Sequence, residues 1–514
     1  MDWRPIDFWA AFFIPEIMEP TLSKFKEYSA GANLVPVYTE LLADFTTPVA
    51  TFAKAASKRG AFLLESAESI DNWGRYSFIG FEPAAVFTLK GSESRLEFAG
   101  GKAVVSAPGE SPLEPLKKYI ASRKICRMEN LPEFFGGAVG YFSYETVSLF
   151  ERLPAPKTES LWADASFGIY DDVIIFDNVR HTVKIVACAR LDEFPTAEEA
   201  YADASKRVAR LVDFYKAAPA QMPSAKASGP IKMKSEMPRA DYCEMVEKAK
   251  EYIKCGEIIQ AVLSQEFTAD AKVDPVSAYR ALRFINPSPY MFCLKIGDDS
   301  LVGSSPETLI RFAGGKAYVS PIAGTRKRGE TPAKDIALAD ELLSNEKERA
   351  EHLMLVDLGR NDISRFCVPG SVQVGEFMTV QRYSHVMHLV SRISGDVKSG
   401  ADAFDALAAA FPAGTLSGAP KVRAMQIINE LEPSARGPNG GAVGYISYGG
   451  SMDMAITIRT LQIKNGVLSV RAGAGIVYDS DPEMEYEETR AKAMAVAKAI
   501  EAASKLELDT SSIL

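Results

Sequence analysis

Two pairs of glutamates are the residues of this 514-residue chain whose type and spacing most strongly suggest chemistry. Glu348 and Glu351 form one pair, and Glu485 and Glu488 form the other. A spacing of three positions places both members on one helix face, where like charges repel by roughly 0.2–0.5 kcal/mol. Two such helices can direct four carboxylates at a divalent cation, and oxygen ligands without histidine or cysteine favour Mg²⁺ over zinc. On spacing alone, solvated acidic residues remain the more common explanation, because carboxylates near a helix N-terminus also favour the helix dipole.

The residues that flank the two pairs predict where the helices begin and end. The first pair lies in NEKERAEHLMLVDLGRND (345–362), where Gly359 suits the position just after a helix. The second pair lies in SDPEMEYEETRAKAMAVAKAI (480–500), where Asp481 suits an N-cap and Pro482 the first helical position. We therefore expect one helix that ends before Gly359 and another that begins at Pro482.

Composition limits the class of protein. A chain of 514 residues is longer than one ordinary domain and can bury a large core. Its 58 basic and 67 acidic residues give a net charge of −9, which argues against a nucleic-acid or anionic-membrane partner. The six cysteines form no CxxC motif and no ligand-like cluster, so we interpret them as reduced thiols of a cytoplasmic protein.

The apolar stretch FWAAFFIPEIM (8–18) is expected to be neither a membrane anchor nor a signal peptide. Pro15 and Glu16 interrupt it, and it is too short to span a bilayer. The residues before it also lack the basic region of a signal peptide.

One stretch has the composition of a linker. KAAPAQMPSAKASGPIKMKSEMPRA (216–240) is rich in proline, alanine, serine and lysine. Before it, β-like runs such as FGIYDDVIIFD alternate with helical ones. After it, apolar residues at helical spacing predict a helix over 241–256 that closes at Gly256, and EIIQAVLSQEF (257–267) predicts a strand.

A ten-residue segment occurs twice. GGAVGYFSYE (136–145) and GGAVGYISYG (440–449) share eight of ten residues, one in each half of the chain. Duplication of a half would explain the similarity, and so would two glycine-rich strands at places where backbones approach closely. Either explanation predicts two comparable β-layers.

Six segments, in this order, closely resemble the chorismate-utilising enzymes, and within that family the component I chains of anthranilate synthase. They are PIAGTRKRGE (321–330), AEHLMLVDLGRND (350–362), GTLSGAPKVRAMQII (414–428), GGAVGYISY (440–448), TIRT (457–460) and RAGAGIVYDSDPEMEYEETRAKA (471–493). The resemblance covers roughly residues 18–505. It implies an α+β fold in which two antiparallel β-sheets pack as a sandwich, with helices outside and the active site in a cleft.

The resemblance also implies a division of the chain. Family chains typically open with a sequence like the one at Met18, so residues 1–17 resemble either an N-terminal extension or the result of a start assigned upstream of the true one. The remaining parts are an N-terminal half with part of a tryptophan regulatory site (18–220), a linker-like stretch (221–238), a chorismate-binding catalytic half (239–505) and a tail (506–514).

By resemblance, the glutamate pairs hold Mg²⁺. Glu351 and Glu488 would bind the ion with support from Glu348 and Glu485, and the ion would take the ring carboxylate of chorismate as a Lewis acid. Lys492, four residues beyond Glu488, could reach the same anion, although a surface lysine is an equally good interpretation.

Further residues would bind the second carboxylate of chorismate, on its enolpyruvyl arm. Arg459 lies in the strand-like AITIRTLQI (455–463), where a lone charge needs a fixed anionic partner, and its guanidinium matches a carboxylate. Gly473, Ala474 and Gly475 could present backbone N–H groups to the same anion. Tyr445, Gly324 and Thr325 complete the substrate contacts that the resemblance implies.

Glu307 and His388 are the acid–base candidates, with Thr325 as a third catalytic candidate. Glu307 could protonate the leaving hydroxyl of chorismate, and His388 could assist at the hydroxyl or at the pyruvate end. A hydrogen-bonded core histidine is an equally good interpretation of His388.

Two positions discriminate between members of the family. Relatives that add water to chorismate carry a lysine at a position that resembles Gln260, and an amide cannot act as a general base. Aminodeoxychorismate synthases carry a nucleophilic lysine where this chain has Ala323. Direct addition of ammonia to give anthranilate is therefore the favoured reaction. The alternatives are aminodeoxychorismate synthase component I and a non-catalytic regulatory subunit with the chorismate fold.

Two partners are expected besides chorismate. None of the cysteines lies in the Gly-x-Cys-x-Gly elbow of a glutaminase, so a glutamine amidotransferase subunit (component II) should deliver ammonia, in a heterotetramer with two copies of each component. Tryptophan should inhibit from a separate site formed by both halves of the chain. The residues of that site are Leu64, Glu65, Ser66, Pro289, Tyr290 and Met291. Without the resemblance, a buried strand end and a rigid turn would explain these two segments.

Overall fold

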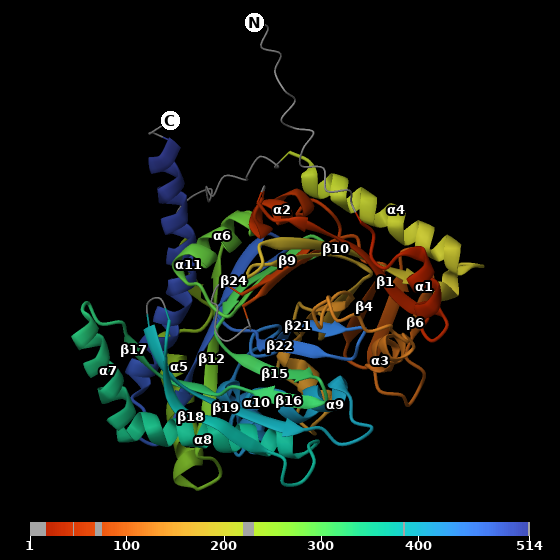
Figure 1. Ribbon diagram of the computed structural model, residues 1–514. Coiled ribbons are helices and arrows are strands. Elements are labelled where there is room, and N and C mark those ends of the chain that lie inside the picture. Colours follow the sequence, from red (N-terminus) through yellow and green to blue (C-terminus); the bar gives the residue numbers. More distant parts are fainter. Residues whose placement is uncertain (1–16, 45, 67–73, 219–230, 384–385, 512–514) are drawn as a thin grey trace, which may run out of the picture.

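Two antiparallel sheets, each with twelve strands among the residues that the structure describes, form the centre of the protein (Figure 1). The computed structural model describes residues 17–44, 46–66, 74–218, 231–383 and 386–511, with side chains as far as Glu501. The predicted extension (1–17) and the last residues of the tail lie largely outside these ranges. Of the linker-like stretch (221–238), residues 221–230 lie outside them, whereas residues 231–238 are described and include the short strand β11 (Lys234–Ser235). The α+β class and the two β-layers that the sequence predicts are confirmed.

The first sheet contains strands from both halves of the chain, and its edge strand β11 (Lys234–Ser235) lies within the predicted linker-like stretch. In spatial order they are β1 (Leu34–Leu42), β10 (Thr182–Arg190), β9 (Asp172–Asp177), β3 (Tyr76–Gly80), β2 (Phe62–Glu65), β13 (Tyr290–Ile296), β14 (Asp299–Ser305), β23 (Thr460–Lys464), β24 (Val467–Ile476), β12 (Gln260–Ala269) and β11 (Lys234–Ser235), and β20 (Gly418–Ala419) pairs with β12. The two halves meet where β2 pairs with β13.

The second sheet also combines strands from both halves of the chain. Its strands, in spatial order, are β17 (Ile322–Lys327), β19 (Val386–Asp396), β16 (Lys316–Val319), β15 (Thr308–Ala313), β22 (Met452–Ile456), β21 (Ala442–Ser447), β7 (Gly137–Phe142), β8 (Ala165–Tyr170), β4 (Ala85–Lys90), β5 (Glu93–Phe98) and β6 (Ala103–Val105), and β18 (Gln373–Arg382) pairs with β19. Here the halves meet where β7 pairs with β21.

The two copies of the GGAVGY segment are these neighbouring strands, β7 and β21, with Gly140 opposite Gly444. A Cβ atom at Gly140 would lie 1.9 Å from the carbonyl oxygen of Ser166, and one at Gly444 would lie 2.0 Å from that of Asp453. Close approach of backbones therefore explains the glycines.

Alternation along the strands divides the core into two layers. In β2, Phe62 packs in the layer between the sheets and Leu63 packs in the layer between the first sheet and the helices; in β13, Phe292 and Met291 divide in the same way. Successive side chains of a strand point to opposite faces, so each strand of the first sheet serves both layers.

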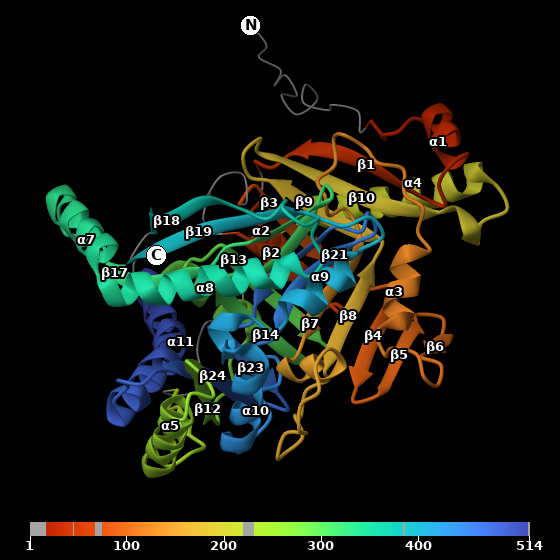
Figure 2. The same cartoon turned by 90° about the horizontal axis from the view of Figure 1, so that it is seen from below.

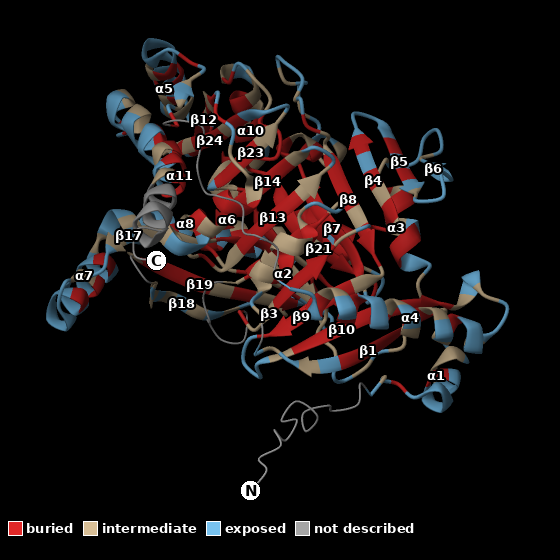
Figure 3. Ribbon diagram, turned by 90° about the horizontal axis from the view of Figure 1, so that it is seen from above, coloured by how far each residue is buried: buried red, intermediate tan, exposed pale blue. Residues whose placement is uncertain are grey.

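Helices cover the outside, and Figure 3 shows the buried residues concentrated along the strands. They are α1 (Leu22–Ser29), α2 (Pro48–Ala55), α3 (Glu114–Ala121), α4 (Ala197–Lys216), α5 (Arg239–Lys254), α6 (Pro275–Ile285), α7 (Pro332–Ser344), α8 (Glu346–Ser364), α9 (Ala403–Ala410), α10 (Lys421–Leu431) and α11 (Pro482–Ser511), with short 3₁₀ turns η2 (Tyr144–Leu149), η3 (Leu191–Glu193) and η4 (Gly414–Leu416). In Figure 2, α7 projects from one edge beside β17. In the part of the chain that the structure describes, no helix is both long enough and apolar enough to cross a bilayer.

The predicted start of α11 is confirmed, and the predicted end of α8 is wrong. Asp481 caps α11, since its Oδ1 accepts from the backbone N–H groups of Glu483 and Met484 at 3.0 Å each. Helix α8 continues through Gly359 to Ser364. Gly359 is buried against the second sheet, where a Cβ atom would lie 3.0 Å from Cδ1 of Ile393, so the glycine permits close packing and does not end the helix.

Candidate active site

The predicted site residues come from strands of both sheets and from two helices. Gly324 and Thr325 lie on β17, and Thr325 is directly opposite His388 on β19. Glu307 immediately precedes β15, and its carbonyl oxygen accepts from the backbone N–H of Ile456 at 3.0 Å. The remaining predicted residues lie on β21 (Tyr445), on β24 (Gly473, Ala474, Gly475), between β22 and β23 (Arg459), on α8 (Glu348, Glu351) and on α11 (Glu485, Glu488, Lys492).

Glu307 is a buried carboxyl that stays protonated at neutral pH. Its side chain accepts a hydrogen bond from Thr415 Oγ1 at 3.0 Å, and Arg459 lies close enough to lower its pKa. Burial outweighs both effects and raises the pKa of Glu307 to about 8. A carboxyl that carries its proton at neutral pH can act as a general acid.

Arg459 does not lie within a strand as predicted. It occupies the break between β22 and β23 with a φ of 49°. Its side chain remains accessible to solvent, although the surrounding protein lowers the pKa of the guanidinium. Among the described residues, this guanidinium makes no hydrogen bond and no ion pair within 4 Å. Burial lowers its pKa, and Glu307 would oppose that shift only in its ionised form. An unpaired guanidinium beside a neutral acid is suited to bind an anion.

His388 faces the same group. Its Nδ1 lies 2.8 Å from the carbonyl oxygen of Gly324 and 3.1 Å from Oγ1 of Thr325. A carbonyl only accepts, so Nδ1 carries the hydrogen and, in the neutral ring, Nε2 is the free base. Burial lowers the pKa of His388, and the charge of Arg459 lowers it further. Arg459 therefore acts on both Glu307 and His388, which places the three groups at one site.

The four glutamates form a second charged group beside this one. Burial raises the pKa of Glu351, and the negative charges of Glu348 and Glu488 raise it further, so α8 and α11 direct these carboxylates toward one another. Burial also raises the pKa of Glu485, and Glu488 adds to that effect. A divalent cation would relieve the repulsion, so the donor set fits Mg²⁺ in charge and in chemistry.

Two basic side chains form ion pairs with carboxylates of this group. Arg326 Nη1 lies 3.0 Å from Glu348 Oε1, and Lys492 Nζ lies 2.7 Å from Glu488 Oε1. Among the described residues, no three histidine, cysteine, aspartate or glutamate side chains lie close enough together to ligate one metal ion. A divalent cation at this place would therefore require these side chains to move.

The two groups touch at Gly324. A Cβ atom there would lie 3.0 Å from Glu348 Oε2, and φ is 62°, so glycine is required on both counts. The same residue accepts from His388. Lys492 makes a further connection, since its Nζ donates to the carbonyl oxygen of Gly473 at 2.9 Å. Lys492 nevertheless remains an exposed residue, so both interpretations of this lysine stay open.

Tyr445 presents a phenol from β21. Its ring centroid lies 4.5 Å from that of Phe134 and 5.9 Å from that of Phe78. Burial raises the pKa of the Tyr445 phenol, so the hydroxyl keeps its hydrogen at any physiological pH. Tyr445 can therefore serve only as a neutral hydrogen-bonding group.

The two discriminating positions lie in the strands that form the site. Gln260 begins β12, is buried, and places its Nε2 2.3 Å from where a Cβ atom at Gly475 would lie. Ala323 is on β17, opposite Leu389, immediately before Gly324. An amide and a methyl group at these positions supply neither a base nor a nucleophile.

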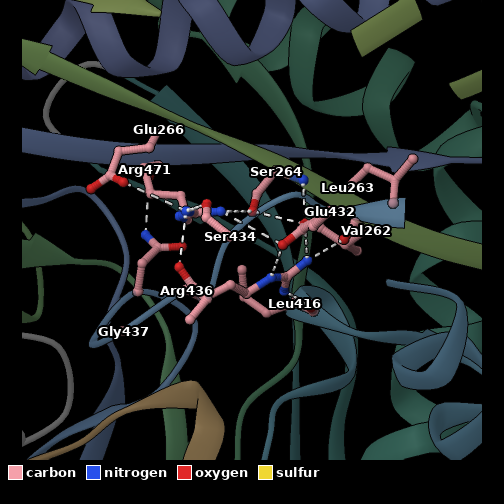
Figure 4. A network of polar contacts seen from close by, with 12 residues as sticks. Val262, Leu263, Ser264, Glu266, Leu416, Glu432, Ser434, Arg436, Gly437 and Arg471 are labelled. Atoms are coloured by element: carbon pink, nitrogen blue, oxygen red, sulfur yellow. Dashed lines mark hydrogen bonds and ion pairs between the residues drawn. The ribbon is translucent and has the colours of Figure 1, made fainter. Parts of the chain in front are cut away.

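A buried ionic network supports these strands (Figure 4). Arg436 forms an ion pair of 2.6 Å with Glu432, whose Oε1 also accepts from the backbone N–H of Ser264 on β12 at 2.7 Å. Arg436 Nη1 donates to the carbonyl oxygen of Leu416 at 2.6 Å, in the η4 turn that presents Thr415. The network thus connects β12 to the residue that holds Glu307.

Both segments of the predicted tryptophan site are adjacent. Met291 on β13 lies directly opposite Glu65 on β2. Glu65 is buried, forms an ion pair with Arg283, and has a pKa that burial raises. Ser66 follows the end of β2 and is partly buried. Leu64 lies opposite Phe292 in the same pairing, and Pro289 immediately precedes β13.

Two residues of the site were missed by the reasoning from sequence. Thr415 and Arg326 both lie inside segments that carry the family resemblance, GTLSGAPK and PIAGTRKRGE. Each lies next to or within a recognised motif, and that position is the only signal that the sequence contains. Their partners, Glu307 and Glu348, become visible only in the structure.

Comparison with known proteins agrees with this geometry. The model of the chorismate binding enzyme family matches residues 61–498. Anthranilate synthase component 1 of Acetivibrio thermocellus is 44% identical over 495 residues, which cover 95% of this chain and 99% of the relative. The protein of the same name from Aquifex aeolicus is 44% identical over 493 residues, covering 94% of this chain and 98% of the relative.

Solved structures give the same result. Anthranilate synthase component I from Streptococcus pneumoniae superposes with a TM-score of 0.74 at 36% identity, covering 84% of this chain and 93% of that one. The menaquinone-specific isochorismate synthase of Escherichia coli has a TM-score of 0.70 at 17% identity, covers 93% and 98% of the two chains, and shares the fold. The chain belongs to the chorismate-binding enzyme family. Within that family it is an enzyme of the anthranilate synthase component I group.

Proposed function

We propose that this chain converts chorismate and ammonia into anthranilate, pyruvate and water. The observation that carries this proposal is the meeting of a protonated Glu307, a neutral His388 and an unpaired Arg459 beside four carboxylates that fit a divalent cation. Chorismate needs these groups, because it has two carboxylates to bind and a hydroxyl that must leave with a proton.

The residues of the chain have distinct tasks in this reaction. Arg459 binds the enolpyruvyl carboxylate, together with backbone N–H groups of the Gly473–Gly475 segment. Ammonia adds at the ring carbon beside the ring carboxylate, while Glu307 gives its proton to the departing hydroxyl, which leaves as water. Nε2 of His388 is the base that accepts a proton as pyruvate is eliminated.

We propose Mg²⁺ as the cofactor, held by Glu351 and Glu488 with Glu348 and Glu485 in support. When bound, the ion supplies Lewis-acid stabilisation of the ring carboxylate. Burial, and after it the charges of neighbouring glutamates, raise the pKa values of Glu351 and Glu485. This supports the assignment, because like charges at such a site need a counter-ion. Arg326 and Lys492 would exchange their carboxylate partners when the ion enters.

Ammonia would come from glutamine, hydrolysed by a component II subunit in a heterotetramer with two copies of each component. No cysteine of the chain lies in a glutaminase elbow, which supports a separate subunit. Aminodeoxychorismate synthesis is the alternative reaction, and Ala323 disfavours it because a methyl group cannot form a covalent adduct with the ring.

We further propose that tryptophan inhibits from the junction of β2 and β13. Arg283 already holds the Glu65 carboxylate, so we assign recognition of the tryptophan α-ammonium to Ser66. Pro289, Tyr290 and Met291 supply the apolar contacts for the indole ring. A ligand at this junction contacts both halves of the chain.

One assay tests the reaction. The purified chain is incubated with chorismate, Mg²⁺ and an ammonium salt, and the fluorescence of anthranilate is followed. We expect anthranilate and pyruvate in equal amounts. Formation of isochorismate, or of aminodeoxychorismate without pyruvate, would contradict the proposed reaction.

A further inference from the structure

The phenol of Tyr290 is a polar connection between the two sheets. Tyr290 begins β13 in the first sheet, and its hydroxyl donates to Asp453 Oδ1 on β22 in the second sheet at 2.9 Å. The same hydroxyl lies 2.9 Å from Oγ1 of Thr308 on β15, also in the second sheet. The Tyr290 ring packs against the apolar layer between the sheets, so these contacts cross a region that is otherwise hydrophobic.

Both partners of Tyr290 lie next to residues of the proposed active site. Asp453 is directly opposite Tyr445 in the pairing of β21 with β22, and Thr308 immediately follows Glu307. Burial raises the pKa of Asp453, whereas Arg311 and the Tyr290 hydroxyl lower it. A buried carboxylate is costly to leave without donors, so the Tyr290–Asp453 contact constrains both strands.

The same end of β13 borders the proposed tryptophan site. Met291, which follows Tyr290, is opposite Glu65, the last residue of β2, and Ser66 follows immediately after that strand. The turn before β13 is also held to the strand that leads to Glu307, because Ser304 Oγ lies 2.8 Å from Oγ of Ser288. A shift of residues 287–291 therefore has to move the Tyr290 hydroxyl relative to the second sheet.

We propose that Tyr290 is a positioning residue, and that its hydrogen bonds to Asp453 and Thr308 transmit tryptophan binding to Tyr445 and Glu307. This inference rests on the regulatory site proposed above. Coupling of this kind is reciprocal: if tryptophan weakens chorismate binding through Tyr290, chorismate weakens tryptophan binding by the same factor. The strand pair β2–β13 is the element that both ligands bias.

The test measures that factor directly. Tryptophan binding is titrated by calorimetry to the full chain, without ammonia, in the absence and presence of saturating chorismate. For the unmodified chain we expect the two Kd values to differ by roughly 5–150-fold. For Tyr290→Phe, which keeps the ring, we expect tryptophan to bind while the two Kd values differ less than about twofold.

Two further variants make the result specific. Asp453→Asn keeps the shape of the side chain but removes the charge that Tyr290 meets, and it should reduce the ratio in the same way. Tyr215→Phe removes a different tyrosine hydroxyl, which donates to the carbonyl oxygen of Leu42 at 3.3 Å, and it should leave the ratio unchanged. Thermal melting would establish whether each variant is folded. If Tyr290→Phe does not fold, Asp453→Asn decides the question.

Three outcomes would overturn the inference. A ratio that persists in Tyr290→Phe or in Asp453→Asn would show that coupling runs elsewhere while the regulatory site stands. An equal loss in Tyr215→Phe would show general loosening of the sheets. Failure of the unmodified chain to bind tryptophan would remove the regulatory site itself, and the inference with it.

Discussion

Thr415 donates its hydroxyl hydrogen to Oε1 of Glu307 at 3.0 Å, although 108 positions separate the two residues in the chain. The hydrogen bond favours the ionised carboxylate, and the nearby charge of Arg459 does so as well. Burial opposes both and prevails, which leaves the Glu307 pKa at about 8. Small changes around Glu307 should therefore be visible in the pH dependence of the enzyme.

Glu307→Gln should lower kcat by about 10²–10⁴-fold, because an amide cannot donate the proton that the leaving hydroxyl needs. In the unmodified enzyme, kcat/KM should fall as pH rises through about 8, where Glu307 loses its proton. Steady-state kinetics measured between about pH 6 and about pH 10 would check both points. If the residual activity of Glu307→Gln still falls as the pH rises, this alkaline limb of the pH profile belongs to another group.

Although Glu307→Gln lowers kcat, it should raise the stability of the fold relative to the unmodified chain at high pH. The folded-state pKa of Glu307 lies above its ordinary value of 4.5, so its favourable contribution is complete below 4.5 and is lost as pH rises through about 8. Glutamine carries no such dependence. The melting temperature of Glu307→Gln relative to the unmodified chain should therefore rise between about pH 7 and about pH 9, on either side of the Glu307 pKa of about 8. A constant difference would contradict the raised pKa.

Thr415→Val should move the alkaline limb to higher pH. The lost hydrogen bond stabilised the ionised form of Glu307, so its removal raises the pKa further. The pH profile of kcat/KM measures the shift. Thr146→Val is a matched control, because the Thr146 hydroxyl donates to the carbonyl oxygen of Asp164 in the first half of the chain. A shift toward lower pH in Thr415→Val would refute the assignment.

Glu351→Gln and Glu488→Gln should each lower activity on the order of 100-fold or more at limiting Mg²⁺, since each withdraws a charge from the proposed cation site. Titration of activity against Mg²⁺, with circular dichroism to verify folding, would measure this effect. Glu487→Gln on the same helix is the control, because Glu487 is ion-paired with Arg490 and lies outside the carboxylate group. Near-normal turnover of both variants at limiting Mg²⁺ would sink the metal assignment.

The isolated chain should use ammonium but not glutamine. A thiol nucleophile for glutamine hydrolysis needs a strained turn and a paired histidine, and Cys255, next to Gly256, comes closest to that motif without matching it. Anthranilate formation with glutamine as the sole nitrogen source, in the absence of any second protein, measures this directly. Cys255→Ser should change neither reaction, and glutamine-dependent synthesis by the chain alone would be decisive against the proposal.

Ser66→Phe should relieve inhibition by tryptophan, because the larger side chain occupies the end of β2 where the amino acid is proposed to bind. Inhibition curves at fixed chorismate should shift to at least about tenfold higher tryptophan, which corresponds to about 1.4 kcal/mol. Ser148→Phe, at an exposed serine of η2, is the control for surface substitution. A fully sensitive Ser66→Phe enzyme would show that tryptophan binds elsewhere.

Local patterns in the sequence predicted several features correctly. The Asp481–Pro482 pair marks the start of α11 because an N-cap acts on backbone N–H groups only two and three residues away. The spacing of the glutamate pairs places them on one helix face for the same local reason. The prediction for Gly359 was wrong because the second sheet packs against this glycine inside the helix. The prediction for Arg459 was wrong because the chain breaks between β22 and β23 at this residue, where φ is 49°.

The sequence by itself determined the family, the two β-layers and the identity of nearly all the chemical groups, since motifs and short periodicities are local properties of the chain. Only the tertiary structure decided which of those groups meet. Thr415 reaches Glu307, Tyr290 reaches Asp453, and β7 pairs with β21 through contacts between segments far apart in the chain. Such contacts depend on strand order and register in two sheets to which both halves of the chain contribute, and no local pattern specifies that order or register. The raised pKa of Glu307 has the same origin, because burial by distant segments sets its value.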